Sequence, residues 1–330
     1  MDNKFLVSPS PHIHSGDSIE KNMYGVIIAL TPALLASFYF FGLGAVVVTI
    51  ASVLGCVATE YLINKYLLRR DELTITDGSA ILTGLLLALN LPSNLPVWII
   101  LVGAFIAIGI GKMSFGGLGC NIFNPALLGR VVLLISFPVQ MTSWPKPLQW
   151  TQYIDVESGA TPLGILKGVK MGIQGNSLDM IPNTLDLLLG QMGGSLGEVS
   201  AIALLLGLVY MLAKKIITWH IPVAILGTVA IFAGALYLYD PTVYPTPDVH
   251  LLTGGMLLGA IFMATDYVSS PMTKNGMLIY GVCIGLITML IRVFGSFPEG
   301  MSFAILIMNG ITPIINLYVK PKHFGGKVAK

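Results

Sequence analysis

Long apolar runs constrain this chain more than any other feature of its sequence. Many of them cover about 17 to 25 residues, the length that an α-helix needs to cross a hydrocarbon layer about 30 Å thick. Only 10% of the 330 residues are charged and 55% are hydrophobic, whereas a soluble domain carries roughly 25% charged residues. Because a backbone in lipid must satisfy its own hydrogen bonds, helices are the economical way to cross. The sequence therefore predicts an all-α integral membrane protein with several transmembrane helices.

Polar breaks between the runs divide the chain into about ten transmembrane helices. The runs at 79–91 and 250–265, the third and the eighth, are short for a full crossing, which is typical of broken or partly inserted helices. The helices are expected to start near Tyr24, Leu43, Ser79, Pro96, Asn121, Glu198, Thr218, His250, Asn275 and Met301, and the last to end near Val319. The expected parts are an N-terminal segment (1–23), five helices (24–141), a loop (142–197), five helices (198–319) and a basic tail (320–330).

The lysines and arginines predict the orientation in the membrane, because short cytoplasmic loops are enriched in them. With the N-terminus inside, thirteen of the eighteen fall on the cytoplasmic side. They are Lys4, Lys21, Lys65, Arg69, Arg70, Lys112, Lys214, Lys215, Lys274, Lys320, Lys322, Lys327 and Lys330. Only Lys146, Lys167 and Lys170 fall outside, all within the loop 142–197. We therefore expect a bacterial cytoplasmic (inner) membrane protein with both termini cytoplasmic and this loop external.

Two short sequence motifs occur in both halves of the chain. "AILTGLLLALNLP" around Thr83 resembles "HLLTGGMLLGAIF" around Thr253, and "NIFNP" (121–125) is echoed by "NGITP" (309–313) in the fifth helix of each half. Since each half has an odd number of helices, the second copy enters the membrane from the opposite side. We predict two inverted five-helix repeats, which in transporters commonly form a site near the midplane. Chance recurrence, or glycines that let helices pack closely, would produce part of the same signal.

The longest polar part of the chain is the loop 142–197, and at its centre stands "DVESGATPL" (155–163). A loop this long is usually functional or disordered. Small residues precede Thr161, so we expect its hydroxyl to be exposed and accessible to an enzyme. An ordinary Asp/Ser/Gly turn would explain the motif when it is taken alone.

The segment "DVESGATPL" resembles the flavinylation sequence recognised by flavin transferases. "GKMSFGGLGCNIFNPALLGR", "TDGSAILTG" and "SPHIHS" also resemble the family that contains the D-type subunit of the Rnf complex and the B-type subunit of the Na+-translocating NADH:quinone reductase. The likeness runs from about residue 8 to residue 319. It implies FMN bound covalently to Thr161 through a phosphoester. It also implies a recognition motif formed by Asp155, Ser158, Gly159, Ala160, Pro162 and Leu163.

The same resemblance implies a second flavin, non-covalent riboflavin, near the cytoplasmic side. Its expected ligands are Asn121 and Asn124, with Phe123 as a packing partner, and an asparagine cap beside a proline is the structural alternative. Lys167 and Lys170 are close enough in sequence to help neutralise the FMN phosphate, or they belong to a solvated loop.

Acidic residues near the short helices are candidates for an ion path. Asp77 and Asp266 are expected at their cytoplasmic ends, where they serve Na+ or H+ movement or simply anchor the helices at the interface. The three cysteines fit neither a disulfide framework nor a metal-binding spacing, so we expect no metal site in this chain.

The resemblance implies a membrane flavoprotein subunit of an ion-translocating ferredoxin:NAD+ oxidoreductase, which passes electrons through FMN and riboflavin and is not active alone. Implied partners are a second FMN-bearing subunit, small membrane subunits, the ferredoxin- and NAD-reacting subunits and a flavin transferase. No nucleic acid is expected. The inverted repeat also resembles urea-transporter architecture, so a small-solute channel and a passive anchor of a redox complex are the alternatives.

Overall fold

The computed structural model describes residues 17–69, 74–153, 156–172, 177 and 180–320. In this part of the chain the regular structure is helical, and β pairing is limited to an isolated bridge between Pro145 and Ser158. The predicted all-α class is confirmed. Five helical stretches are long and apolar enough to cross a membrane: Ile19–Leu67, Val97–Phe115, His220–Tyr239, Lys274–Phe294 and Met301–Tyr318.

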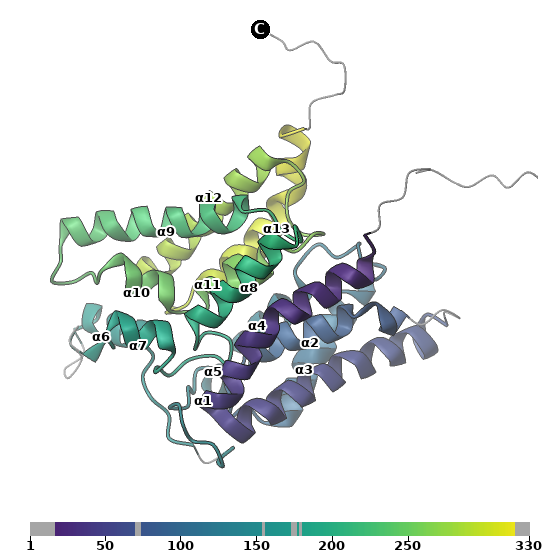
Figure 1. Ribbon diagram of the computed structural model, residues 1–330, viewed down its shortest axis with the longest axis horizontal. Helices are drawn as coiled ribbons and strands as arrows, with labels where there is room; N and C mark the ends of the chain where they lie inside the picture. The colour runs from purple at the N-terminus through teal and green to yellow at the C-terminus, as the bar shows by residue number, and fades with distance from the viewer. Residues whose placement is uncertain (1–16, 70–73, 154–155, 173–176, 178–179, 321–330) are drawn as a thin grey trace, which may run out of the picture.

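The first long stretch, α1 (Ile19–Leu62), contains two of the expected helices because it turns back at Gly42. This residue has φ 50° and ψ −127°, and a Cβ there would overlap the backbone of Trp150. Such a conformation and such a close approach are open to glycine alone. In Figure 1 the purple first arm and the blue second arm diverge from this turn. The N–H of Leu43 donates to the Trp150 carbonyl at 2.9 Å, so this turn and the 142–197 loop share one end of the molecule, here called the loop end.

The rest of the first half consists mainly of short helices. The helices α2 (Ser79–Leu89) and α3 (Val97–Phe105) and the π-helix η3 (Ile106–Ile110) pack against α1. The helix α4 (Pro125–Ser136) packs against α2, α3 and η3, and α5 (Pro138–Met141) contacts α4. The predicted short third helix is confirmed as α2. Its Gly84 lies directly on α1, where a Cβ would be 2.7 Å from Cα of Val53, and the Ser52 hydroxyl donates to the Gly84 carbonyl at 2.8 Å. The small residue thus permits the close approach of the two helices.

The second half follows a different pattern of breaks. Its helices are α8 (Ala201–Ala213), α9 (His220–Tyr239), α10 (Pro247–Leu252), α11 (Met256–Leu258), the π-helix η6 (Gly259–Met263), α12 (Lys274–Phe294) and α13 (Met301–Tyr318). The expected eighth helix is broken between α10 and α11, where Gly254 and Gly255 have φ 72° and 64°. The predicted interruption is confirmed. The two Thr-Gly motifs therefore differ, since Gly84 is helical and Gly254 is not.

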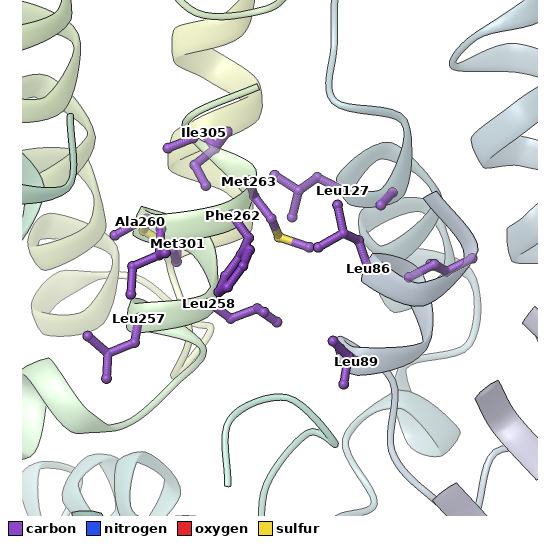
Figure 2. Close-up of a cluster of buried hydrophobic side chains, with 14 of the residues drawn as sticks. Leu86, Leu89, Leu127, Leu257, Leu258, Ala260, Phe262, Met263, Met301 and Ile305 are labelled. Atoms are coloured by element: carbon purple, nitrogen blue, oxygen red, sulfur yellow. The ribbon is translucent and has the colours of Figure 1, made fainter. Parts of the chain in front are cut away.

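The two halves meet in a buried apolar cluster. Figure 2 shows Leu86 and Leu89 of α2 and Leu127 of α4 on one side, with Met263 reaching toward them from the second half. Lipid chains are as apolar as these side chains, so close packing contributes more to this contact than transfer out of water. A polar contact adds to it, because the Asn124 side-chain amide donates to the Met263 carbonyl at 3.2 Å.

The long loop also carries two short helices, α6 (Pro162–Lys170) and α7 (Thr184–Leu189). In Figure 1 they lie at the lower left, beside α10. Leu163 at the start of α6 lies against Gly254, the residue at the break between α10 and α11. The loop is thereby folded onto the second half.

Candidate functional site

Thr161 is the N-cap residue of α6. Its hydroxyl accepts a hydrogen bond from the N–H of Gly164 at 3.1 Å, and its backbone is extended. The side chain is only 9% exposed, so the expectation of an exposed hydroxyl is wrong. The physical reason is that α6 begins at Pro162 and buries Leu163 against the second half, which draws the preceding threonine inward.

The residues before Thr161 form a small extended pair with the segment after α5. The N–H of Gly159 donates to the Trp144 carbonyl at 2.8 Å, and the N–H of Lys146 donates to the Glu157 carbonyl at 3.0 Å. Ser158 and Ala160 are exposed. The motif thus presents small residues at the surface and turns its threonine toward the interior. Asp155 lies outside the described residues, as do residues 1–16 and 321–330.

Thr161 lines a cavity of about 210 Å³, here called the Thr161 cavity. Its other lining residues are Arg130, Leu134, Met141, Thr142, Trp144, Gly159, Ala160, Gly164, Phe297, Pro298 and Glu299. One side is an ion pair between Arg130 of α4 and Glu299, and both side chains are largely buried. Arg130 also donates to the side-chain oxygen of Asn90 at 3.0 Å and to the Ser302 hydroxyl at 2.7 Å. These bonds hold three separate segments together around the cavity.

The arrangement at Thr161 suits a phosphate and a planar ring. The first N–H groups of a helix lack intrahelical partners and carry partial positive charge, so a phosphate on the Thr161 oxygen would be stabilised by α6. Trp144 and Phe297 offer aromatic surface on the cavity wall. The volume is below the roughly 300 Å³ at which most ligand pockets begin. A flavin attached here would extend partly beyond the cavity.

Lys167 and Lys170 lie farther along α6 and do not line the Thr161 cavity. The Lys167 ammonium donates to the carbonyls of Gly295, at 3.0 Å, and Ser296, while Lys170 donates to the Val293 carbonyl. Burial and the neighbouring Lys170 charge lower the pKa of Lys167. Both side chains therefore bind the C-terminal end of α12, and neither is simply solvated.

At the opposite end of the molecule, Asn121, Asn124 and Asp266 line one cavity of about 50 Å³. The Asn124 side chain accepts from the N–H of Leu127 at 3.3 Å, so the structural alternative of an asparagine cap is correct for this residue. Asn121 donates to the Phe123 carbonyl at 3.1 Å. A water molecule occupies about 30 Å³ of liquid, so the cavity has room for water but not for a flavin ring.

The two candidate ion-path residues each hold a local turn. Asp77 accepts from the backbone N–H and the hydroxyl of Ser79, at 2.8 and 2.5 Å, and Asp266 accepts from the Ser269 hydroxyl at 2.8 Å. Ser79 lines the same small cavity as Asp266. The structure thus brings Asp266, but not Asp77 itself, to the wall of this cavity.

Sequence reasoning did not predict that Lys112 and Glu198 are buried, or which groups they bind. Lys112 donates to Glu60 at 2.8 Å and to the Ser79 hydroxyl at 2.6 Å, and both charged side chains are buried. Glu198 is buried and accepts from the N–H of Ser195, at 3.3 Å, and from the N–H of Gly254. Lys112 and Glu60 are 52 residues apart, and Glu198 and Gly254 are 56 apart, so local spacing carried no signal of these contacts.

Packed apolar helices, a broken helix and a capped threonine facing a cavity define this molecule as an integral membrane protein with a candidate ligand site at its loop end. The chain belongs to the NQR2, RnfD, RnfE family, whose model matches residues 6–325. The family expected from the motifs is confirmed.

Individual relatives match almost end to end. The chain is 44% identical to the D-type subunit of the proton-translocating ferredoxin:NAD(+) oxidoreductase complex of Clostridium ljungdahlii, over 98% of this chain and 97% of the relative. It is 47% identical to the D-type subunit of the Na(+)-translocating ferredoxin:NAD(+) oxidoreductase complex of Acetobacterium woodii, over 97% and 95%. It is 40% identical to the D-type subunit of the ion-translocating oxidoreductase complex of Stutzerimonas stutzeri, over 93% and 92%. Relatives named for protons and for sodium are thus about equally similar.

Proposed function

We propose that this chain is the D-type membrane subunit of a bacterial ion-translocating ferredoxin:NAD+ oxidoreductase complex. Two relatives that are 44% and 47% identical over nearly the full length carry that name. The chain has no recognisable ferredoxin, NAD or iron–sulfur motif. Those reactions therefore belong to partner subunits, and this subunit contributes electron transfer and coupling to Na+ or H+ movement.

The observation that carries the electron-transfer part is the position of Thr161. It is the N-cap of a nine-residue helix and lines a cavity with aromatic walls. We propose that its hydroxyl oxygen carries FMN as a phosphoester. When bound, FMN would supply the redox chemistry, while α6 would stabilise the phosphate and Trp144 would limit the position of the ring.

The burial of Thr161 implies an order of events. Thr161 as a residue is 9% exposed, and its hydroxyl accepts from the N–H of Gly164, so the folded chain leaves a transferase little access to it. Modification therefore requires either that the segment from Ser158 to Gly164 opens, or that it is modified before α6 packs. The exposed Ser158 and Ala160 would remain available for recognition in both cases.

The test uses the full chain co-expressed with a flavin transferase. We expect flavin fluorescence to remain with the denatured wild-type chain on a gel, and mass spectrometry to place the added mass on Thr161. Thr161→Val should abolish the fluorescence. Thr142→Val is the matched control, because Thr142 lines the same cavity and also carries a hydroxyl. An unmodified Thr161 in the wild-type chain would remove the main support for the proposal.

The riboflavin implied by the family does not fit inside the small cavity at Asn121 and Asn124, which measures about 50 Å³. If this chain contributes to such a site, Asn121, Phe123 and Asn124 would do so from its surface, with another subunit covering the ring. Changing both asparagines to leucine in the assembled complex should then reduce extractable riboflavin. Unchanged riboflavin content would exclude these residues as ligands.

We also propose that the ten helices form two inverted five-helix repeats with the 142–197 loop on the external side. Two observations support this arrangement. The backbone nitrogen of Asn124, from "NIFNP", is 3.0 Å from the side-chain amide group of Asn309, from "NGITP", so the two related motifs meet in space. In addition, Thr83 and Thr253 each donate to the carbonyl four residues earlier, at 2.9 and 2.6 Å.

Asp77 and Asp266 remain candidates for the ion path under this proposal. Both lie at the end of the molecule opposite the loop, and Asp266 lines the small cavity with Asn121. Both carboxylates accept from a nearby serine, but only Asp266 lines the cavity. Replacing Asp266 with asparagine should therefore lower ion movement per electron transferred more than the same replacement of Asp77. Equal effects, or none, would remove Asp266 from the path.

A further inference from the structure

A second cavity lies at the loop end, between α6, the segment after α9 and the C-terminal end of α12. It measures about 360 Å³ and is larger than the Thr161 cavity. Among the described residues, the two linings share only Pro298. The lining of this α6–α12 cavity includes Lys167, Lys170, Tyr244, His250, Arg292 and Phe294. The proposed flavin chemistry makes no use of it.

The charged side chains among the described lining residues of this cavity all have the same sign. Lys167, Lys170 and Arg292 are cationic, and no carboxylate is among the described lining residues. Arg292 is 8% exposed, and its two terminal nitrogens donate to the neutral carbonyls of His250, Thr253 and Gly254. Glu198 and Glu299 are close enough to compensate part of the Arg292 charge, but neither lines this cavity. The described lining therefore presents three cations and no carboxylate to the cavity, which suits a negatively charged ligand.

Unused polar atoms remain on this wall. Among the described residues, the buried Nε–H of Arg292 is a donor with no hydrogen-bond partner, and Nδ1 of His250, which donates or accepts according to the tautomer, also has none. Lys170 donates to the Val293 carbonyl, but an ammonium has three N–H groups, so others are free. The pKa of Lys167 is lowered by burial and by Lys170, which also reflects the concentration of positive charge here. A phosphate oxygen can accept from the lysine and arginine N–H groups.

The remaining walls are apolar and lead into the membrane region. Leu166, Met171 and Phe294 line the cavity, and Phe294 is largely exposed at the end of α12. A second, open apolar groove runs between α9 and α12, lined by Thr228, Ile231, Phe232, Ala235, Leu236, Tyr239, Val282 and Leu286. Leu286 lines the groove and Val293 lines the cavity, and the two residues are seven apart, so they lie on the same face of α12. An extended chain that follows this face would pass from the cavity into the groove, although the two described linings share no residue.

We propose that the α6–α12 cavity binds the phosphate headgroup of an anionic phospholipid, whose acyl chain lies in the groove between α9 and α12. The phosphate oxygens accept from Lys167, Lys170 and Arg292. The acyl chain lies in the groove between α9 and α12, against Ile231 and Leu286. A free phosphate would satisfy the cations but would leave the groove unused.

The experiment measures lipid binding to the purified full-length chain in detergent by native mass spectrometry. The probes are phosphatidylglycerol, phosphatidylcholine and inorganic phosphate. We expect phosphatidylglycerol to bind at least about tenfold more tightly than phosphatidylcholine. The double variant Lys167→Gln/Lys170→Gln should lose at least about tenfold in that affinity. Lys146→Gln is the control, since Lys146 is an exposed lysine of the same loop paired with Glu157.

A second variant tests the groove without changing any charge. Leu286→Trp fills the groove and should weaken phosphatidylglycerol binding severalfold. Wild-type protein expressed without a flavin transferase should bind the lipid as the flavinylated protein does, because the α6–α12 cavity and the Thr161 cavity share only Pro298 among their described lining residues. The proposal is overturned if the two lipids bind equally, if the lysine variant binds like Lys146→Gln, or if inorganic phosphate binds and phosphatidylglycerol does not displace it.

Discussion

At the scale of single residues, Arg130 has the most consequential environment. It is buried in α4, yet its guanidinium pairs with Glu299 and donates to Asn90 and Ser302. It therefore connects the end of α2, the segment before α13 and the Thr161 cavity. A buried pair of this kind contributes little net stability as a pair, but the loss of one member leaves the other charge uncompensated.

Replacing Arg130 with methionine should destabilise the protein by about 3–5 kcal/mol, the usual cost of breaking a buried pair. The double variant Arg130→Met/Glu299→Gln should be less destabilised, because no lone carboxylate remains. Lys146→Met, which breaks an exposed pair with Glu157, should cost less than about 1 kcal/mol. Thermal unfolding in detergent measures all three. A double variant as unstable as Arg130→Met would contradict the argument.

The cap at Thr161 has a stability effect apart from any cofactor. Thr161→Val removes the oxygen that accepts from Gly164 and should cost about 1 kcal/mol in the unmodified protein. Thr161→Ser keeps this oxygen and should remain within a few tenths of wild type. Both are measured by thermal unfolding of protein expressed without a flavin transferase. Equal stability of the two variants would show that the cap contributes nothing.

At the scale of elements, the breaks matter more than the helices. The turn at Gly42 folds α1 into a hairpin, and the break at Gly254 and Gly255 divides α10 from α11. Gly42 packs against the backbone of Trp150 in the long loop, and Gly254 packs against the side chain of Arg292. Glycine is required at these positions for backbone conformation and for close approach.

Gly42→Ala should destabilise the protein, because alanine in this sparsely populated conformation costs about 1–3 kcal/mol before its clash with Trp150 is counted. Gly227→Ala on α9 is the control, since a Cβ there meets nothing within 4 Å. That change should stabilise the helix by up to about 1 kcal/mol. Melting temperatures of the two variants test the contrast, and a tolerated Gly42→Ala would refute the role of the turn.

At the scale of the whole molecule, two sets of charged and polar groups lie at opposite ends of one bundle. The loop end holds Thr161 and the α6–α12 cavity, whereas the other end holds Asp266 and the buried Glu60–Lys112 pair. The cluster of Figure 2 joins the halves between these ends. The proposed FMN site at Thr161 and the proposed ion-path residue Asp266 therefore lie at different ends of the protein.

The proposed orientation predicts which cysteines react from which side. Cys120 is exposed at the end opposite the loop, and Lys146 is exposed in the loop itself. The reagent is a maleimide that does not cross membranes, and it is added to cells with a permeable outer envelope and an intact cytoplasmic membrane. It should label Lys146→Cys in a Cys120→Ser background. It should not label Cys120 of the wild-type protein. Opened membranes should make Cys120 reactive. The reverse pattern would mean that the loop is cytoplasmic.

Most helix positions could be predicted from the sequence, because an apolar run long enough to cross lipid is a local property. The expected starts near Met301, Asn275 and Thr218 lie within two residues of the observed starts of α13, α12 and α9. The motif around Thr161, together with the segments 10–15, 76–84 and 111–130, was likewise sufficient to indicate the family. The environment of that threonine was not predictable, because its burial depends on where α6 packs.

Tertiary structure alone decided which distant groups meet. Arg130 and Glu299 are 169 residues apart, and Lys170 and Val293 are 123 apart. No periodicity records such pairs, since their free energy depends on three-dimensional distance and burial rather than on spacing along the chain. The apolar pattern therefore determined that this chain folds as a helical bundle in lipid. The packing of its broken helices and long loop determined where charge, cavities and Thr161 lie within that bundle.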